Sequence, residues 1–313
     1  MRSIADNSIL NPVQIDAEKG HRRRVQAGYV GGVALLLALT VYGLDYYLLD
    51  LLQRPFSPKH PFLRPSGWIG LWLGILGTMM FCGIFLYPIR KRWEWLRRLG
   101  NTRHWLDFHI LLGLTAPLII AFHSSFKFRG IAGMAFWIMS AVALSGIAGR
   151  YLYSQIPRSL TAAELSLKEV QDLLAQWSKE LTAPKVIPIT GLASIFHLPG
   201  ADEVKDEPMV RAFWSMLLLD LRRMLGVARL RRQACSASGR ILTLGGLLVS
   251  NNKELERAIE AIQEQAVLSK RILFLTRSQQ VFHLWHVVHK PFSYSFLVLA
   301  CLHILVVMLF GVR

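Results

Sequence analysis

Five long apolar segments constrain the fold of this chain more than any other feature. They cover residues 25–49, 67–88, 105–123, 131–153 and 289–312. The hydrocarbon core of a bilayer is about 30 Å thick, and about 20 apolar helical residues cross it. Hydrophobic residues fill 53% of the 313 positions, too large a share for an ordinary soluble domain. We therefore expect an all-α membrane protein, a bundle of about five transmembrane helices with a mostly helical cytoplasmic insertion.

The first apolar segment follows the basic run Arg22 to Arg24, as in a signal peptide. Its apolar stretch is longer than the core of a signal peptide, and no small-residue cleavage site follows it. We interpret it as a retained span.

The chain carries 36 Lys and Arg against 20 Asp and Glu, a formal net charge of +16. The basic residues gather before the first span, between spans two and three, and between spans four and five. Because basic residues collect on the cytoplasmic side, this alternation places the N-terminus in the cytoplasm and the C-terminus outside, in a bacterial inner (plasma) membrane. A basic cytoplasmic face explains the positive charge, so we expect membrane lipid as a partner and no binding of nucleic acid.

The spans divide the chain into four parts. These are a cytoplasmic arm (1–24), transmembrane helices one to four (25–155), a cytoplasmic helical insertion (156–280) and transmembrane helix five (281–313). No glycine fingerprint for a dinucleotide occurs in the insertion. We also expect no flavin or nicotinamide domain after the fifth span.

The insertion has its own helical pattern. We expect helices over Ala162–Leu181, over Met209–Arg232 and from about Glu254 onward, with a Pro-rich linker over Pro184–Pro199. The second of these is amphipathic and ends in arginines. That composition suits a helix on an anionic membrane surface. It suits equally well a helix that packs within a small cytoplasmic domain.

Two pairs of histidines share one spacing within the apolar segments. His109 and His123 lie fourteen residues apart in the third segment, and His289 and His303 lie fourteen apart in the fifth. At about 100° and about 1.5 Å per residue, fourteen residues make about four turns less 40° and rise about 21 Å. Both members of a pair therefore point to nearly the same face, one near each membrane surface.

The charge pattern makes the third and fifth spans run in the same direction. Equal spacings then bring like ends together, so that His109 faces His289 near the cytoplasm and His123 faces His303 near the other surface. Imidazoles inside a membrane are costly without a partner or function, and two of them supply both axial ligands of a haem iron. The sequence therefore predicts two non-covalent b-type haems.

Other metal chemistry fits less well. No carboxylate or thiol completes a zinc or copper shell beside these histidines. The cysteines Cys82, Cys235 and Cys301 form no CxxC pair, which excludes covalent c-type haem and argues against an iron–sulfur cluster.

A competing inner ligand stands three residues before His289. His286 could replace it, although the matched spacing would then be lost. Alternatively, His286 joins His104 and His283 in a wet interfacial region, where a quinone or an electron-transfer partner docks or where the side chains simply face water and headgroups. The remaining histidines, His21, His60 and His197, are expected to be ordinary surface residues.

Several cations lie where haem propionates would emerge. On the inner side these are Arg103, Arg150 and Lys290, and on the outer side Lys127 and Arg129. Pairing of a cation with a propionate is physically reasonable, although the topology alone explains the inner three.

With these histidines in place, the chain resembles bacterial di-haem b-type cytochromes and, more distantly, the transmembrane core of ferric reductases and NADPH oxidases. The resemblance rests on the stretches from Trp105 to Ser124 and from Phe282 to His303. It implies a helical bundle that carries electrons between opposite membrane faces. The reductases continue into a flavin and nicotinamide domain, and only a superficial echo of their HPF[ST] motif occurs at His289–Ser293. The long insertion also departs from their pattern.

The leading hypothesis is transmembrane electron transfer by the membrane subunit of a larger redox system. The expected partners are a cytoplasmic or quinol electron donor and an extracytoplasmic redox protein such as a cytochrome c. Six-coordinate iron leaves no open position for substrate, so we expect no catalysis at the metal. The alternatives are a quinol oxidoreductase subunit and, in another class, a non-redox transporter or membrane scaffold with intramembrane histidines.

Overall fold

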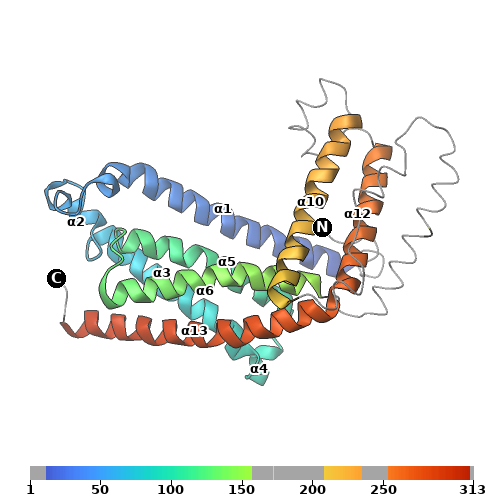
Figure 1. Cartoon of the computed structure of the whole chain (residues 1–313). Helices are drawn as coiled ribbons and strands as arrows, with labels where there is room; N and C mark the ends of the chain where they lie inside the picture. Colours follow the sequence, from blue (N-terminus) through green and yellow to red (C-terminus); the bar gives the residue numbers. More distant parts are fainter. Residues whose placement is uncertain (1–11, 157–171, 173–207, 235–252, 311–313) are drawn as a thin grey trace. The chain divides into compact units, whose positions relative to one another are not determined.

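The computed structural model describes residues 12–156, 172, 208–234 and 253–310 (Figure 1). Every regular element within these ranges is helical, which confirms the predicted all-α class. The chain divides into two compact units. The span unit contains the described residues of Leu10–Gly149 and His286–Arg313, and the insertion unit contains those of Arg150–Trp285.

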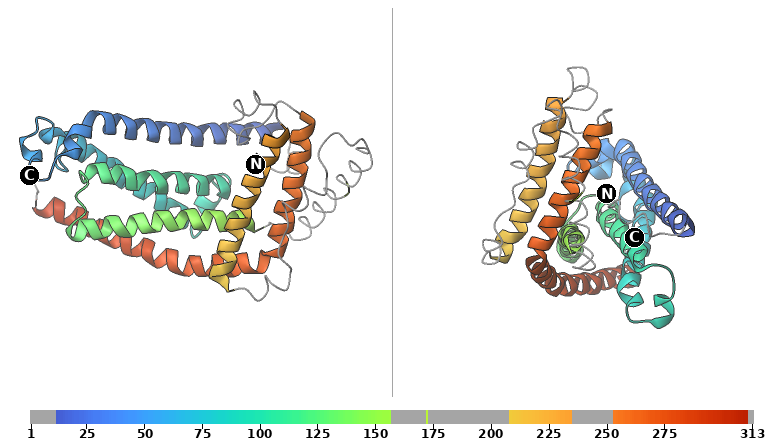
Figure 2. Two further views of the ribbon diagram at one scale, coloured as in Figure 1. Left: turned by 45° about the horizontal axis from the view of Figure 1, so that its top comes forward. Right: turned by 90° about the vertical axis from the view of Figure 1, so that its right-hand side faces the viewer.

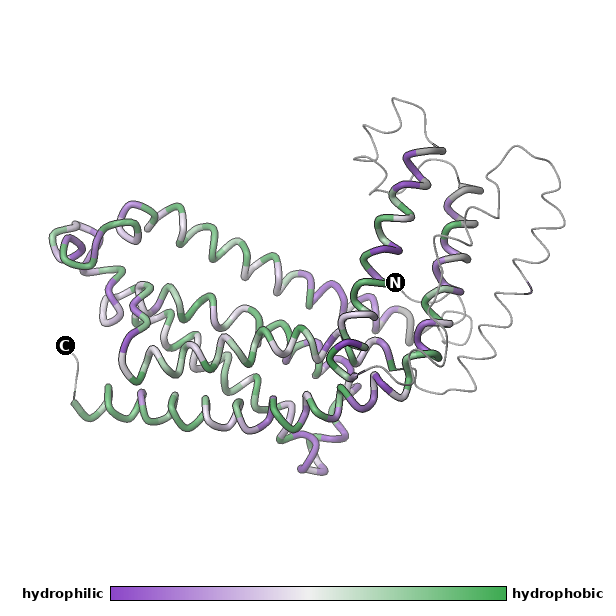
Figure 3. The backbone as a smooth tube through the Cα atoms, viewed as in Figure 1, coloured by the Kyte–Doolittle hydropathy of each residue, from purple (hydrophilic) through white to green (hydrophobic). Residues whose placement is uncertain are grey.

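Five helices are long and apolar enough to cross a membrane, as the sequence predicts. They are α1 (Pro12–Leu48), α3 (Trp68–Arg90), α5 (Thr102–His123), α6 (Gly130–Gln155) and α13 (Leu275–Phe310). Hydrophobic residues follow most of their lengths in Figure 3, at the positions of the five predicted segments. The chain is a multi-pass membrane protein.

Two of these helices extend well beyond the predicted spans. α1 has 37 residues and begins at Pro12, so it includes the second half of the arm that the sequence predicts before the first span. α13 has 36 residues and begins at Leu275, before the predicted start of the last segment. At about 1.5 Å per residue each is about 55 Å long, against about 30 Å of hydrocarbon. An apolar segment therefore marks the membrane crossing and not the end of the helix.

The span unit is built around α5. This helix packs most closely on α3 and also packs on α1. Leu39 of α1, Leu73 of α3 and the α5 residues Ile119 and Phe122 form a buried cluster between them. The side chain of Ile120 of α5 packs against Gly77 of α3, where an added Cβ would lie 2.3 Å from Ile120 Cδ1. The long helices of this unit lie alongside one another in the left view of Figure 2.

Short elements join these helices. They are η2 (Arg54–Phe56), α2 (His60–Leu63) and α4 (Glu94–Arg97). The buried guanidinium of Arg54 donates to the carbonyls of Tyr47 (2.8 Å) and Ser125 (2.5 Å), so it ties the end of α1 to the end of α5. This contact fixes the turn that follows His123.

The insertion unit contains α10 (Met209–Ala234) and α12 (Lys253–Leu273), which lie side by side (Figure 1). They pack antiparallel. Arg231 near the end of α10 binds Glu256 near the start of α12 through two contacts of 2.9 and 2.6 Å. Asp220 in the middle of α10 binds Lys270 near the end of α12 at 2.5 Å.

Both predicted helices of this unit are therefore confirmed over their described residues. Met216 of α10 is buried with Leu152 and Phe274. One face of α10 therefore packs within the insertion unit, as expected for a helix that packs within a small domain. The expected helix over Ala162–Leu181 and the linker over Pro184–Pro199 lie outside the described residues, apart from position 172.

Candidate functional site

The four spaced histidines lie on two helices that run in the same direction. α5 carries His109 and His123, and α13 carries His289 and His303, all within the span unit. Figure 1 and the left view of Figure 2 agree on the common direction of the two helices. This agrees with the parallel arrangement inferred from the charges. Each helix has an internal proline between its two histidines, Pro117 and Pro291.

The histidines of the two helices lie near one another in the predicted combinations. His289 is close to His109, and His123 is close to His303. His286, the competing candidate, is also close to His289. The structure thus brings like ends together, while ligation of iron stays a prediction.

A backbone carbonyl of α3 fixes the ring of His123. Its Nδ1 lies 2.8 Å from the oxygen of Gly70. Because a carbonyl only accepts hydrogen bonds, Nδ1 carries the proton, and the lone pair of the neutral ring is on Nε2. Gly74 makes room for this ring, since an added Cβ there would lie 2.7 Å from His123 Cε1 and 2.8 Å from Nδ1.

The ring of His109 is held in the same manner one level away. Its Nδ1 donates to the carbonyl of Ile84 at 3.1 Å. The ring of Tyr87 lies 5.2 Å from the His109 ring, between centroids. Both α5 histidines therefore direct Nδ1 to α3 and carry their lone pair on Nε2.

A serine of α6 orients His289. The hydroxyl of Ser145 donates to the carbonyl of Val142 at 2.8 Å and lies 2.8 Å from His289 Nδ1. Since that hydroxyl has one proton, it accepts from Nδ1, and the lone pair of this ring too is on Nε2. In three of the four histidines a partner thus holds Nδ1 and leaves the lone pair on Nε2, the tautomer in which an imidazole can bind a metal.

Phe296 lies midway between the two α13 histidines. It is seven residues from each, so it shares their face, and it is buried. Its ring meets that of Phe81 of α3 edge-on, with centroids 4.8 Å apart. On α5 the corresponding midpoint is Ala116, which is fully buried. A large and a small side chain therefore lie between the two histidine levels.

The cations predicted to meet haem propionates are placed as follows. Arg103 is half-buried at the start of α5, and Lys127 and Arg129 are exposed beyond its end. Lys290 is exposed next to His289, and Arg150 is half-buried in the insertion unit. Their pairing with propionates stays a prediction.

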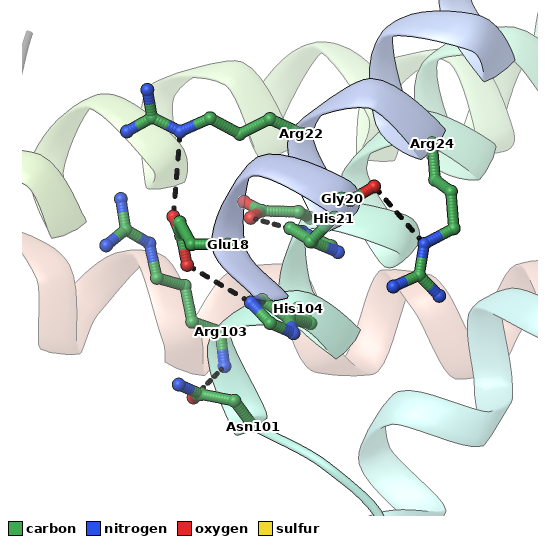
Figure 4. A network of polar contacts seen from close by, with 9 residues as sticks. Glu18, Gly20, His21, Arg22, Arg24, Asn101, Arg103 and His104 are labelled. Carbon is green, nitrogen blue, oxygen red and sulfur yellow. Dashed lines mark hydrogen bonds and ion pairs between the residues drawn. The ribbon is translucent and has the colours of Figure 1, made fainter. Parts of the chain in front are cut away.

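The expectation that His21 is a surface residue is wrong. Its side chain is buried between α1 and α5, where Nε2 lies 3.2 Å from Asp107 Oδ2 and the ring stacks on His104 (Figure 4). His104 binds Glu18 Oε2 at 3.3 Å, so it joins two helices and does not face an open interfacial region. The reason is that α1 begins at Pro12, before the apolar segment, and its first turns place His21 in contact with α5.

The other histidines differ from one another. His60 is half-buried and lies 3.0 Å from the hydroxyl of Tyr46, which also departs from the expected surface position. His283 is exposed and His286 is half-buried. His197 lies outside the described residues. Among the residues that the structure describes, no three His, Cys, Asp or Glu side chains converge as a metal site.

The sequence analysis missed several residues of this site, and three of them orient or contact the histidine rings: Gly74, Tyr87 and Ser145. All three lie in apolar segments where nothing in a single sequence distinguishes them from neighbouring packing residues. No protein-family model, curated protein or solved structure significantly matches the chain.

Proposed function

We propose that this chain carries electrons across a membrane through two b-type haems. His109 and His289 would hold one haem, and His123 and His303 would hold the other. The observation that carries the proposal is the set of Nδ1 contacts to Ile84, Gly70 and Ser145. A structural histidine needs no particular tautomer, whereas an axial ligand needs its Nε2 lone pair and a fixed ring plane.

Bis-imidazole haem exchanges one electron and leaves no open coordination position for substrate. The residues of this chain would position the haems, exclude water and bind the propionates. The histidines set the two levels, and the apolar rings of Phe296 and Phe81, which are in contact, would keep water out of the space between these levels. Arg103, Arg150, Lys127, Arg129 and Lys290 are the proposed propionate partners.

A larger redox system is the proposed setting. The chain would be its membrane subunit in a bacterial plasma membrane, with the N-terminus in the cytoplasm. A cytoplasmic protein or a quinol is the proposed donor, and an extracytoplasmic redox protein such as a cytochrome c is the proposed acceptor.

Haem content of the purified full-length chain tests the proposal. We expect a reduced b-type spectrum and about two haems per chain. His109→Ala, His123→Ala, His289→Ala and His303→Ala should each lose about one haem, and His283→Ala is the matched control that should keep both. A colourless preparation from haem-replete cells, or four alanine variants with the parental spectrum, would overturn the proposal and favour a transporter or scaffold.

The same series decides between the two inner ligands. If His289 is the ligand, His289→Ala loses the inner haem and His286→Ala retains it. The opposite pattern would move the ligand to His286. Reduction of the haems by quinol, in membranes without other subunits, would identify the chain as the quinol-oxidising subunit.

A further inference from the structure

α10 has an apolar stripe that faces away from its packed side. Its large hydrophobic side chains recur every three or four residues and are exposed, with Trp214 55% and Met224 58% accessible. They are Val210, Trp214, Leu218, Leu221, Met224 and Leu225. At about 100° per residue these six positions cover about 120° of the helix surface. They are a single stripe and not scattered exposed residues.

This stripe is additional to the face that stabilises the insertion unit. Ala212 and Met216 are fully buried against Leu152 and Phe274. Asp220 binds Lys270 and accepts from the hydroxyl of Tyr151 at 2.8 Å. α10 thus buries one apolar face and exposes a second, which a water-surrounded helix of a small domain does not require.

Exposed arginines border the stripe. Arg211, Arg222 and Arg229 are all exposed. At about 100° per residue they lie within about 20° of one another, next to the edge formed by Leu218. The one acidic residue of α10, Asp220, is bound to Lys270 and Arg223 on the packed side. The exposed surface of α10 is therefore apolar with a cationic border.

We infer that this stripe of α10 lies on a bilayer surface that contains anionic phospholipid. The apolar side chains would enter the boundary between headgroups and acyl chains, and the three arginines would reach lipid phosphates. Trp214, in the middle of the stripe, is of the type that prefers this boundary. A bilayer is present around every copy of a multi-pass chain, whereas a protein partner with an acidic border would have to be supplied.

Spin labelling of the full-length chain in lipid nanodiscs tests the inference. Leu218→Cys would be labelled in a Cys82→Ser, Cys235→Ser, Cys301→Ser background. The nanodiscs would contain phosphatidylcholine alone or with phosphatidylglycerol. With phosphatidylglycerol, we expect a label that is accessible to oxygen and protected from a water-soluble nickel chelate. A label at Arg222→Cys, on the border, should be shallower.

Three other outcomes would overturn the inference. A label at position 218 that is open to the nickel chelate in both lipids faces water. A label immobilised and shielded from both relaxants is covered by protein, either another segment of this chain or a second copy. Equal depth in both lipids would remove the role of anionic headgroups.

Replacing the three border arginines tests separately whether their positive charge contributes to lipid binding. In Arg211→Gln, Arg222→Gln, Arg229→Gln the lipid-bound fraction of the 218 label should fall, because each arginine near an anionic surface favours binding by about fivefold. The matched control, Arg92→Gln, Arg97→Gln, Arg98→Gln, removes three exposed arginines of the span unit and should leave the 218 label unchanged. Equal losses in both triple variants would show a general charge effect and contradict the inference. Haem content is independent of these readouts.

Discussion

The rings of His21 and His104 stack across the α1–α5 interface, with centroids 3.7 Å apart and planes inclined by 16°. Each ring binds a carboxylate of the other helix, His21 that of Asp107 and His104 that of Glu18 (Figure 4). The two helices are thus joined by reciprocal polar contacts in the part of α1 that precedes its apolar segment. The two halves differ in exposure, because the side chain of His21 is 4% exposed and that of His104 25%.

This difference predicts unequal effects of the two histidines on stability. His21→Leu should cost about 1–3 kcal/mol, since a buried carboxylate contact is lost. His104→Leu should cost about 0–1 kcal/mol, since Glu18 keeps its ion pair with Arg22 at 3.6 Å. Thermal unfolding in detergent measures both. The double variant should lose less than the sum, because the rings are in contact. Equal single losses would contradict the ranking.

Gly74 gives a sharp test of the outer histidine level. Gly74→Ala would place a methyl group 2.7 Å from His123 Cε1, so the ring must move. On the proposed function, we expect loss or a spectral shift of the haem at His123 and His303, with the haem at His109 and His289 retained. Gly113→Ala is the matched control on α5, since an added Cβ there meets nothing within 4 Å. Haem-to-protein ratios and reduced spectra measure both variants. Two unperturbed spectra would show that the His123 ring does not hold haem.

Much of the fold can be predicted from the sequence, because the thickness of the membrane sets the length of each apolar helical segment. Residues 105–123 and 131–153 match α5 and α6 within a few residues, since the polar turns next to them are short. The start of α1 could not be predicted this way. Residues 12–24 carry no apolar stripe, and their helix continues from the span and is held by tertiary contacts such as His21 with Asp107.

The candidate site, like the fold, has a part that the sequence predicts and a part that it does not. The spacing of fourteen residues predicts which histidines approach each other, because helix geometry is regular over that distance. Ser145 could not be found, because a serine within an apolar helix commonly bonds its own backbone, as Ser145 does with Val142. Its second role, toward His289, depends on how α6 and α13 are placed, which no single helix determines.

Ser145 therefore predicts a change at the inner level alone. Ser145→Ala removes the oxygen that lies 2.8 Å from His289 Nδ1. Loss of such an outer contact typically lowers metal affinity about 10–100-fold. On the proposed function, we expect weaker binding or a shifted midpoint potential for the haem at His109 and His289. Ser293→Ala is the matched control, because Ser293 bonds the backbone carbonyl of His289 and not its ring. Redox titration distinguishes them, and identical curves would argue against His289 as a ligand.

The buried pair of Asp220 and Lys270 predicts both a mutational and a pH effect. Asp220→Asn should cost about 3–5 kcal/mol, since Lys270, 3% exposed, would be left as an uncompensated buried charge. Lys270→Met should cost less, because Asp220 keeps Tyr151 and Arg223. The double variant should recover most of the larger loss. Thermal unfolding of the three variants in detergent measures the cycle, and strictly additive losses would contradict it.

Burial lowers the pKa of Lys270 below its usual 10.5, although the contact with Asp220 raises it in part. The folded chain then holds this proton less tightly than the unfolded chain. As the pH rises toward 10.5 the unfolded state binds more protons, so this group's contribution to folding becomes more favourable. The stability of the parent chain relative to Lys270→Met should therefore increase over that window. A difference that stays constant or falls with rising pH would show that the Lys270 ammonium is stabilised, not penalised, by its surroundings.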